Sequence, residues 1–323
     1  MPKNKFDNKN ILVTGGAGFI GNEVVSILDA LGAKVTVLDD LSSGASSNLS
    51  NNIRLMVGDI HNFDTVKKAM EGNEIVFHLA ARPFVPYSYN NPRDVLETNV
   101  IGSANIALAC VAENIQLCVC ISSSEVYGSN SLGLMSEDSP TEPFSTYAVA
   151  KLAGERVCFS ISKEHQLPLI IVRPFNTYGP KDNHPRIIPT IISQLHRNNF
   201  VKLGNPNPIR DLTYVTDTAR GIIDISSNDK AIGQIINVGT SKGYSPKELV
   251  KIISSLMGKD NIRIESDNSL LRPHDPHRML ADCRKVQSMV GWKPKVSIEK
   301  GLSKTIDWYI SAGSWSWEKE KDL

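Results

Sequence analysis

A glycine-rich turn near the N-terminus constrains the fold of this chain more than any other feature. The apolar run Ile11–Thr14 leads into Gly15-Gly16-Ala17-Gly18-Phe19-Ile20-Gly21, and the amphipathic segment Phe19–Leu31 has the length of a helix. In such a strand–turn–helix the first glycine permits the tight turn, the second lets the backbone approach a pyrophosphate, and the third lets helix and strand pack closely. The helix N-terminus adds N–H donors and a positive dipole. This spacing predicts the first unit of a dinucleotide-binding domain.

Short β-branched runs alternate with helix-length segments up to about residue 173, which predicts a parallel sheet covered by helices on both faces. The expected strands are Ile11–Thr14, Lys34–Leu38, Arg54–Val57, Glu74–Leu79, Leu117–Ser122 and Leu169–Arg173, and the longest expected helices are Phe19–Leu31, Pro92–Glu113 and Ser145–His165. We therefore expect an α/β fold with a Rossmann-type, doubly wound parallel sheet over residues 1–174. A smaller C-terminal α/β substrate-binding lobe covers residues 175–323, and a strand near 235–239 returns to the sheet.

The composition excludes several other classes of function. Lys and Arg total 35 and Asp and Glu total 34, so the net charge of +1 offers no basic surface to grip nucleic acid or an anionic membrane. We expect no membrane span, because no apolar run approaches the roughly 20 residues that one needs. The polar N-terminus lacks the apolar core of a secretory signal, which predicts a cytoplasmic protein. The five cysteines lack metal-ligand spacing, so we expect buried free thiols and no metal.

An acidic residue at the end of the second expected strand indicates which dinucleotide is bound. A carboxylate at Asp39 accepts hydrogen bonds from both ribose hydroxyls of NAD and repels the 2′-phosphate of NADP, so the sequence predicts NAD. After the third strand, Gly58-Asp59-Ile60 can reach the adenine, and Leu79-Ala80-Ala81 follows the fourth strand where the cofactor passes. Asn99, within a long expected helix, is either a cofactor contact or a buried amide that bridges helices.

A tyrosine and a lysine one helical turn apart carry the expected chemistry. Tyr147 and Lys151 share one helix face, and the fifth strand ends nearby in sequence with Ser122-Ser123-Ser124-Glu125. A cation held near a phenol lowers the pKa of the phenol from about 10. We therefore expect Lys151 to make Tyr147 available as a general base near neutral pH.

Together these motifs resemble the extended short-chain dehydrogenase/reductase superfamily, specifically its NAD-dependent nucleotide-sugar epimerase/dehydratase branch. The likeness covers nearly the whole chain. It implies that Tyr147 takes the proton of a sugar hydroxyl, that Lys151 binds the nicotinamide ribose and that Ser123 hydrogen-bonds the reacting oxygen. It also implies a nucleotide-diphosphate sugar as substrate and a homodimer joined through the two long helices over 92–113 and 145–165.

Motifs in the second lobe extend the resemblance to the substrate. Asn176, in Arg173-Pro-Phe-Asn176-Thr-Tyr178, matches the family's nucleotide-sugar-binding asparagine. Arg210 and Arg272 match the two arginines that clamp the substrate diphosphate, and guanidinium groups suit phosphate oxygens. In the segment Lys181–Arg186 we expect His184 and Arg186 to lie in a substrate-gating loop or to have ordinary surface roles.

The residues at 123–125 bear on which reaction follows the shared oxidation at C4. A base beside C5 leads to elimination, and Glu125 is in the place of that base. The hexose 4,6-dehydratases that this chain resembles have Thr-Asp-Glu at the positions of Ser123-Ser124-Glu125. Simple 4-epimerases usually have a small residue at the position of Glu125. In its Ser-Glu pair this chain resembles the UDP-glucuronate decarboxylases and the 4,6-dehydratases of the legionaminic-acid pathway, which have the same pair. The sequence of the second lobe looks closest to that of the latter group.

We therefore expect a nucleotide-sugar 4,6-dehydratase in which Tyr147 and NAD oxidise C4, Glu125 removes the C5 proton, and Ser124 or a water that it positions assists the leaving hydroxyl. A 4-epimerase is the alternative, and a UDP-glucuronate decarboxylase is a further one. An NAD-binding regulator without chemistry is disfavoured because Tyr147, Lys151 and Ser123 are all present.

The expected site has two overlapping groups of residues. Cofactor contacts are expected from Gly15, Gly18, Phe19, Ile20, Gly21, Asp39, Asp59, Ile60, Leu79, Ala80, Ala81, Asn99, Ser122, Tyr147 and Lys151. Substrate contacts are expected from Ser123, Ser124, Glu125, Asn176, Arg210 and Arg272. The aromatic tail is expected to pack the last helix rather than to bind sugar, and it comprises Trp308, Tyr309, Trp315 and Trp317.

Overall fold

A seven-stranded sheet, parallel throughout, forms the larger part of the molecule in the computed structural model, which describes residues 4–129 and 133–312. In spatial order its strands are β10 (Ile235–Val238), β6 (Leu169–Pro174), β5 (Leu117–Ile121), β4 (Ile75–His78), β1 (Asn10–Thr14), β2 (Lys34–Asp39) and β3 (Arg54–Val57). The order reverses direction between β1 and β4, which is the switch point of a doubly wound fold. The expected fold class is confirmed, and six of these strands lie within one residue of the predicted bounds.

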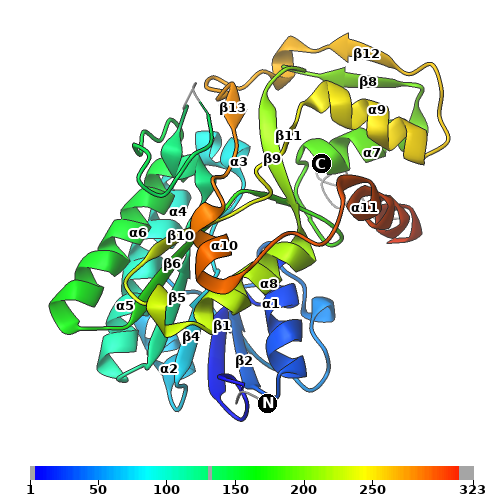
Figure 1. The fold of residues 1–323 in the computed structure, drawn as a ribbon. Coiled ribbons are helices and arrows are strands. Elements are labelled where there is room, and N and C mark those ends of the chain that lie inside the picture. The colour runs from blue at the N-terminus through cyan, green and yellow to red at the C-terminus, as the bar shows by residue number, and fades with distance from the viewer. Residues whose placement is uncertain (1–3, 130–132, 313–323) are drawn as a thin grey trace.

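Helices cover both faces of this sheet, as its apolar strands require. One face packs against α1 (Phe19–Ala30), α8 (Val215–Ser226) and α10 (Arg284–Val290), and the other against α2 (Phe63–Met70), α5 (Ser103–Ala112) and α6 (Thr146–His165). Figure 1 shows α5 and α6 on one side of the sheet and α1 and α8 on the other. All five cysteines are free; four are buried in the layer under α5 and α6, while Cys283 is half-buried.

The expected long helix over 92–113 contains a widened turn. It comprises α4 (Pro92–Leu96), the π-helical segment η2 (Glu97–Gly102) and α5, which follow one another without a break. The stretch Pro92–Ala112 is 21 residues long with a mean hydropathy of 1.5, so it is long and apolar enough to cross a membrane. The expectation that no segment reaches this length is wrong. Half of its most apolar window is buried within the protein, as in the core helices of soluble proteins, so length and composition are weak evidence for a span.

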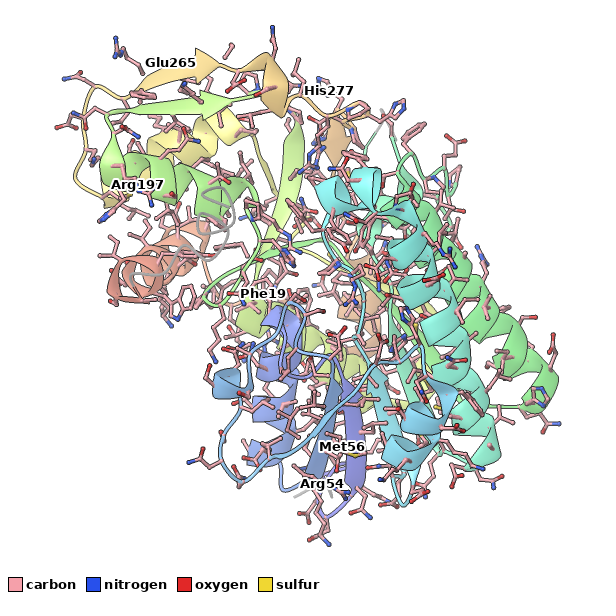
Figure 2. The ribbon with its side chains drawn as sticks, turned by 180° about the vertical axis from the view of Figure 1, so that it is seen from behind. Phe19, Arg54, Met56, Arg197, Glu265 and His277 are labelled. Carbon is pink, nitrogen blue, oxygen red and sulfur yellow. The ribbon has the colours of Figure 1, made fainter. Side chains whose placement is uncertain are left out.

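A second lobe has its own apolar core. Its elements are β7 (Asn176–Tyr178), α7 (Ile187–Arg197), β8 (Phe200–Leu203), β9 (Ile209–Tyr214), β11 (Gly243–Tyr244), α9 (Pro246–Leu256), β12 (Arg263–Ser266), β13 (Arg278–Met279) and α11 (Ile298–Ala312). Short helices complete the chain at η1 (Ser46–Asn48), α3 (Val85–Asn90), η3 (Ser124–Tyr127), η4 (Asp229–Ala231) and η5 (Asn268–Leu270). Figure 2 shows Phe19 at the junction of the lobe with the main sheet and Glu265 on the outer side of the lobe.

The chain passes between the two units more than once. After β9 it returns to the main sheet through α8 and β10, and β10 pairs in parallel with β6 where a returning strand was expected. It returns again through α10, which packs against β10. On the last helix Tyr309 is buried in the core of the second lobe, whereas Trp315 and Trp317 lie outside the described residues.

A buried ion pair fastens α6 to the sheet. Arg173 on β6 donates from Nε and Nη2 to the two carboxylate oxygens of Glu155 on α6, at 2.9 and 2.6 Å. Their side chains are 1% and 0% exposed. The guanidinium carbon also lies 4.8 Å from the ring centroid of Tyr127, whose hydroxyl donates to Asn237 at 2.7 Å. One cation thus joins α6, η3 and the sheet edge at β10.

Replacing this arginine by a residue of similar length tests its contribution. Arg173→Met leaves the Glu155 carboxylate buried without its partner, and we expect the free energy of unfolding to fall by about 3–5 kcal/mol in urea denaturation followed by circular dichroism. The matched control Arg93→Met removes an exposed pair with Glu97 and should leave the unfolding midpoint nearly unchanged. Equal stability of Arg173→Met and the parent would contradict this account of the pair.

Candidate active site

A large cavity of about 1100 Å³ lies between the carboxyl ends of the main-sheet strands and the second lobe. Crevices at this edge of a doubly wound sheet are where such folds bind their ligands. Most of the residues predicted from the sequence line it: Gly15, Gly18, Phe19, Ile20, Gly21, Asp39, Asp59, Ile60, Leu79, Ala80, Ala81, Ser122, Ser123, Glu125, Tyr147, Lys151, Asn176, Arg210 and Arg272. Of the predicted residues, all within the described part of the chain, Asn99 and Ser124 are not among the lining.

The glycine turn leaves no room for side chains at its critical positions. A Cβ on Gly15, whose φ is +70°, would lie 2.6 Å from the Ala80 nitrogen, and a Cβ on Gly21 would lie 2.0 Å from the Gly15 carbonyl oxygen. Gly18 caps α1 and faces the cavity. The backbone N–H groups at the start of α1 are therefore open to an anion such as a pyrophosphate.

Asp39 lies at the end of β2 beside this turn. Its two carboxylate oxygens accept hydrogen bonds from the backbone nitrogens of Ala17 and Leu41, each at 2.9 Å. Burial raises the pKa of Asp39, and these two hydrogen bonds oppose the rise. The carboxylate is thus fixed at the position where a ribose would bind.

The prediction overlooked an arginine next to Asp39. Arg82 donates to Asp40 at 2.8 Å and to Asp94 at 2.9 Å, so it ties the loop after β4 to the loop after β2. Asn99 holds the backbone of Arg82 through both atoms of its amide, with Oδ1 accepting from the Arg82 nitrogen at 2.9 Å. Asn99 therefore bridges the helix to a cavity loop and is the buried amide of the two alternatives.

Tyr147 is buried beside the cavity, with 7% of its surface exposed. Burial raises its pKa, while a hydrogen bond from Ser123 and the charge of Arg186 lower it and the charge of Glu125 raises it further. Lys151 donates instead to the carbonyl oxygen of Ile121 at 2.7 Å, and burial lowers its pKa. The expectation that Lys151 lowers the pKa of Tyr147 stays a prediction, and the Lys151 ammonium is hydrogen-bonded at the end of β5.

The turn after β5 presents Glu125 and Ser124 differently. Ser123 caps η3, and its hydroxyl accepts from the Glu125 backbone nitrogen at 3.2 Å. Glu125 lines the cavity, where its charge acts on both Tyr147 and Arg210. Ser124 is 1% exposed and lies outside the cavity lining, so its expected role at a leaving hydroxyl is not supported by its position.

Two arginines predicted to clamp a diphosphate lie on the second-lobe side of the cavity. Arg210 on β9 donates to Asp275 at 2.5 Å and to the Pro276 carbonyl oxygen at 2.6 Å, while Arg272 is exposed in the segment before β13. Asn176 on β7, two residues after the end of β6, also lines the cavity. The cavity thus runs from a dinucleotide cradle past Tyr147 and Glu125 to a cationic end.

Comparison with known proteins agrees with this layout. A family model described as GDP-mannose 4,6 dehydratase matches residues 12–305. A dTDP-glucose 4,6-dehydratase from Streptomyces niveus is 32% identical over 326 residues, which cover 96% of this chain and 95% of the relative. The chain belongs to this dehydratase family.

Solved structures of the family share the fold. A dTDP-glucose 4,6-dehydratase, DesIV of Streptomyces venezuelae, crystallised with NAD, matches with a TM-score of 0.87 and 31% identity over 95% of this chain and 98% of that chain. A UDP-glucose 4-epimerase of Thermotoga maritima, crystallised with UDP-glucose, matches with a TM-score of 0.88 and 29% identity over 94% of this chain and 100% of that chain. The extended short-chain dehydrogenase/reductase family predicted from the sequence is confirmed, and with it an NAD-dependent enzyme.

The residues of this chain fit NAD on structural grounds of their own. The glycine turn packs so closely that a Cβ would clash with backbone at Gly15 and Gly21, and Asp39 is oriented by two backbone hydrogen bonds. The Ser122 hydroxyl is buried at the cavity edge and has no hydrogen-bond partner among the described residues, so it is free to bind a ligand atom.

Neutralising Asp39 tests the cofactor assignment. We expect Asp39→Asn to bind NAD roughly 10- to 100-fold more weakly than the parent, because a hydrogen bond from a ribose hydroxyl to a charged group is lost. NAD bound to the purified protein can be quantified by chromatography after heat release, and its affinity by calorimetry. Asp64→Asn, an exposed change on α2, is the control and should retain NAD as the parent does. Equal retention by Asp39→Asn would remove Asp39 from the cofactor site.

A buried histidine beneath the glycine turn predicts how stability depends on pH. The ring nitrogens of His78 bond to Thr14 and Ser103 at 2.8 and 2.9 Å, and burial lowers the pKa of His78 to about 3. The imidazole of His78 binds a proton near pH 6.5 in the unfolded chain, but only near pH 3 in the folded chain. Its contribution to the free energy of unfolding is therefore complete above pH 6.5 and is lost as the pH falls toward 3.

Between pH 6.5 and 5 we expect this one group to remove about 1–2 kcal/mol from the free energy of unfolding. Urea denaturation at each pH measures the loss. The variant His78→Asn should be less stable at pH 7 but should vary less between pH 7 and 5, while the exposed control His165→Asn should follow the parent. An identical pH slope in His78→Asn and the parent would contradict a neutral, buried imidazole.

Proposed function

We propose that this protein is an NAD-dependent nucleotide-sugar 4,6-dehydratase that acts through a 4-keto intermediate. The observation that carries the proposal is the placement of Glu125, a carboxylate that lines the cavity within electrostatic reach of Tyr147. Elimination needs a second base besides the one that serves C4, and these two side chains supply both. The likeness to dTDP-glucose 4,6-dehydratases supports the same reaction.

The chain's own residues have distinct tasks in this reaction. When bound, NAD accepts hydride from C4 of the hexose and later returns it to C6. Tyr147 takes the proton of the C4 hydroxyl, and Ser123, which hydrogen-bonds this phenol, holds the reacting oxygen in place. Lys151, buried at the end of β5, is in position to hold the nicotinamide ribose. Arg210 and Arg272 neutralise the substrate diphosphate at the other end of the cavity.

The 4-keto group acidifies the hydrogen at C5, and Glu125 removes it as a proton. The C6–O bond then breaks and the C6 hydroxyl leaves as water, which requires one proton. Because Ser124 does not line the cavity, the carboxylic acid just formed on Glu125 is the group that we assign to supply that proton. When hydride is restored at C6, C5 takes up a proton from solvent and Tyr147 releases the proton that it took from the C4 hydroxyl, so the net change is the loss of one water with no second carboxylate.

A nucleotide-sugar 4-epimerase is the alternative, and two observations favour it. No carboxylate stands at position 124, and the fold matches a UDP-glucose 4-epimerase as closely as it matches the dehydratase structure. Decarboxylation of a UDP-glucuronate is the third family reaction, and it is supported by the Ser124-Glu125 pair and by the likeness to UDP-glucuronic acid decarboxylases. In both alternatives Tyr147 and NAD perform the same first oxidation.

The mass of the product separates these reactions. Incubation with UDP-, dTDP-, GDP- and CDP-hexoses should yield a product lighter by one water for at least one of them in mass spectrometry. We expect Glu125→Gln to reduce this dehydration by at least roughly 100-fold, since it removes the base at C5. The exposed control Glu164→Gln should retain the parent rate. A product of unchanged mass would establish epimerisation, and release of carbon dioxide from a uronate would establish decarboxylation.

We also infer a homodimer formed through the α4–α5 and α6 helices. These helices expose apolar side chains to solvent, namely Leu96, Ile101, Leu108 and Val149. Burying this apolar surface against a second copy of the chain lowers the free energy, because the apolar side chains leave water. Light scattering should give twice the mass of one chain, and a monomer would contradict the inference. A cytoplasmic location without nucleic-acid or membrane partners stays a prediction from the sequence.

A further inference from the structure

The segment 181–186, which we call the strap, forms part of the cavity wall. It lies between β7 and α7, and all of its residues from Asp182 to Arg186 line the cavity. The loops that follow β2 and β4 also line the cavity. In the sheet β1 lies between β2 and β4, so the glycine turn at the end of β1 lies between these two loops. A segment that contacts both loops therefore bridges the glycine turn.

On the side of β2 the strap is joined to the loop that follows Asp39. The side chain of Asn183 donates to the carbonyl oxygen of Ser43 at 3.2 Å. The same loop is held to the glycine turn, because the backbone nitrogen of Ala45 donates to the carbonyl oxygen of Ala17 at 3.2 Å. This loop thus connects the strap to the dinucleotide cradle.

On the side of β4 the strap has two contacts with the loop that carries Arg82. The ring of His184 stacks on Phe84 with 5.2 Å between centroids and 10° between planes. Arg186 donates to the carbonyl oxygen of Pro83 at 3.2 Å. His184 and Arg186 therefore join the second lobe to the main sheet, and they do not have the ordinary surface roles that the sequence left open.

Lys181, the first residue of the strap, bonds to two residues that hold the glycine turn. Its ammonium donates to the side-chain oxygen of Asn22 at 3.0 Å and to the carbonyl oxygen of Asn48 at 3.5 Å. The Asn22 amide in turn donates to the carbonyl oxygen of Gly18 at 2.7 Å. The Asn48 amide donates to the carbonyl oxygen of Ala17 at 2.8 Å. The φ of Lys181 is +67°, a left-handed backbone that is unfavourable for a residue with a Cβ, so these bonds hold it against strain.

The strap is also fastened to the second lobe. The hydroxyl of Tyr309 on α11 donates to the carbonyl oxygen of Asp182 at 2.5 Å. The carboxylate of Asp182 is buried and pairs with Arg186, at the other end of the strap, at 2.5 Å. The strap is thus held at its ends and along its length by contacts between residues of the chain itself.

We propose that the strap controls the passage of NAD into and out of its site, and that the hydrogen bonds of Lys181 and Tyr309 keep the strap closed. A dinucleotide bound at the glycine turn is enclosed by the strap, so it leaves only when the contacts with the loops after β2 and β4 open. The inference rests on the proposed function, in which the hydride taken from C4 must return to the same hexose at C6. Closure keeps NADH in place between these two steps.

This role predicts a specific kinetic signature. The bonds of Lys181 and Tyr309 join protein atoms only, and both residues lie outside the cavity lining. Weakening these bonds opens the strap equally with and without NAD, so association and release accelerate by the same factor and the dissociation constant stays unchanged. A side chain that supports the bound NAD itself would change the release rate and the dissociation constant together.

The release of NAD can be measured without any nucleotide sugar. Protein loaded with radiolabelled NAD is mixed with a large excess of unlabelled NAD, rapid filtration follows the loss of label, and calorimetry gives the dissociation constant. We expect Lys181→Met and Tyr309→Phe each to release NAD roughly tenfold faster than the parent at an unchanged dissociation constant, because each variant loses hydrogen bonds of the strap. The control Lys251→Met, an exposed change on α9, should release NAD as the parent does.

Two results would overturn the proposal. One is an unchanged release rate in either variant; Tyr309→Phe loses a single hydroxyl, so it keeps the test valid if Lys181→Met does not fold. The other is a dissociation constant that rises in proportion to the release rate, because these side chains would then support the glycine turn rather than closure. If the parent dehydrates no nucleotide hexose, the proposed function fails, while the release of NAD still decides the role of the strap.

Discussion

Ionising a phenol where water is scarce is the constraint on which this site depends. Tyr147 must be buried to meet a sugar and a nicotinamide ring, and burial by itself favours the neutral phenol. Nearby charges shift the pKa of Tyr147 in opposite directions. The charge of Glu125, which is needed for a later step, raises this pKa, and the charge of Arg186 lowers it. Glu125 lies in η3 at the end of β5, and Arg186 lies directly before α7 of the second lobe.

The frame that holds these groups is rigid for identifiable reasons. Parallel strands bring the glycine turn, Asp39 and the turn after β5 to one edge of the sheet. Behind that edge, the bidentate Arg173–Glu155 pair fixes the helix that carries Tyr147, and Tyr127 stacks on the same guanidinium at the end of the turn that carries Glu125. The relative position of the two bases is thus set by one buried cation that touches neither of them.

Much of this could be predicted from the sequence because it depends on local backbone geometry. The glycine spacing, the alternation of strands and helices, and the one-turn separation of Tyr147 from Lys151 each follow from fixed periods. The resemblance to a known family then supplied the substrate-binding residues. Strand bounds were predicted to within a residue because apolar runs covered on both faces end where polar turns begin.

The features that could not be predicted from the sequence depend on contacts between distant segments. One backbone rotation in η3 decides that Glu125 faces the cavity and Ser124 does not, and no pattern in Ser123-Ser124-Glu125 reveals it. The direction of the Lys151 ammonium is set by its hydrogen bond to the Ile121 carbonyl oxygen, and the place of Arg186 depends on a loop 39 residues from Tyr147 that contacts Pro83. Side-chain direction and loop closure are tertiary properties, so they required the structure.

The central claim is that one base acts at C4 and a second base acts at C5 of the same hexose. The fate of the hydrogen at C4 tests this claim most directly. A nucleotide hexose labelled with deuterium at C4 is converted by the parent enzyme, and nuclear magnetic resonance locates the label. The account predicts a 4-keto, 6-deoxy product with deuterium at C6 and a solvent-derived hydrogen at C5. Deuterium retained at C4 in a product of unchanged mass would contradict it.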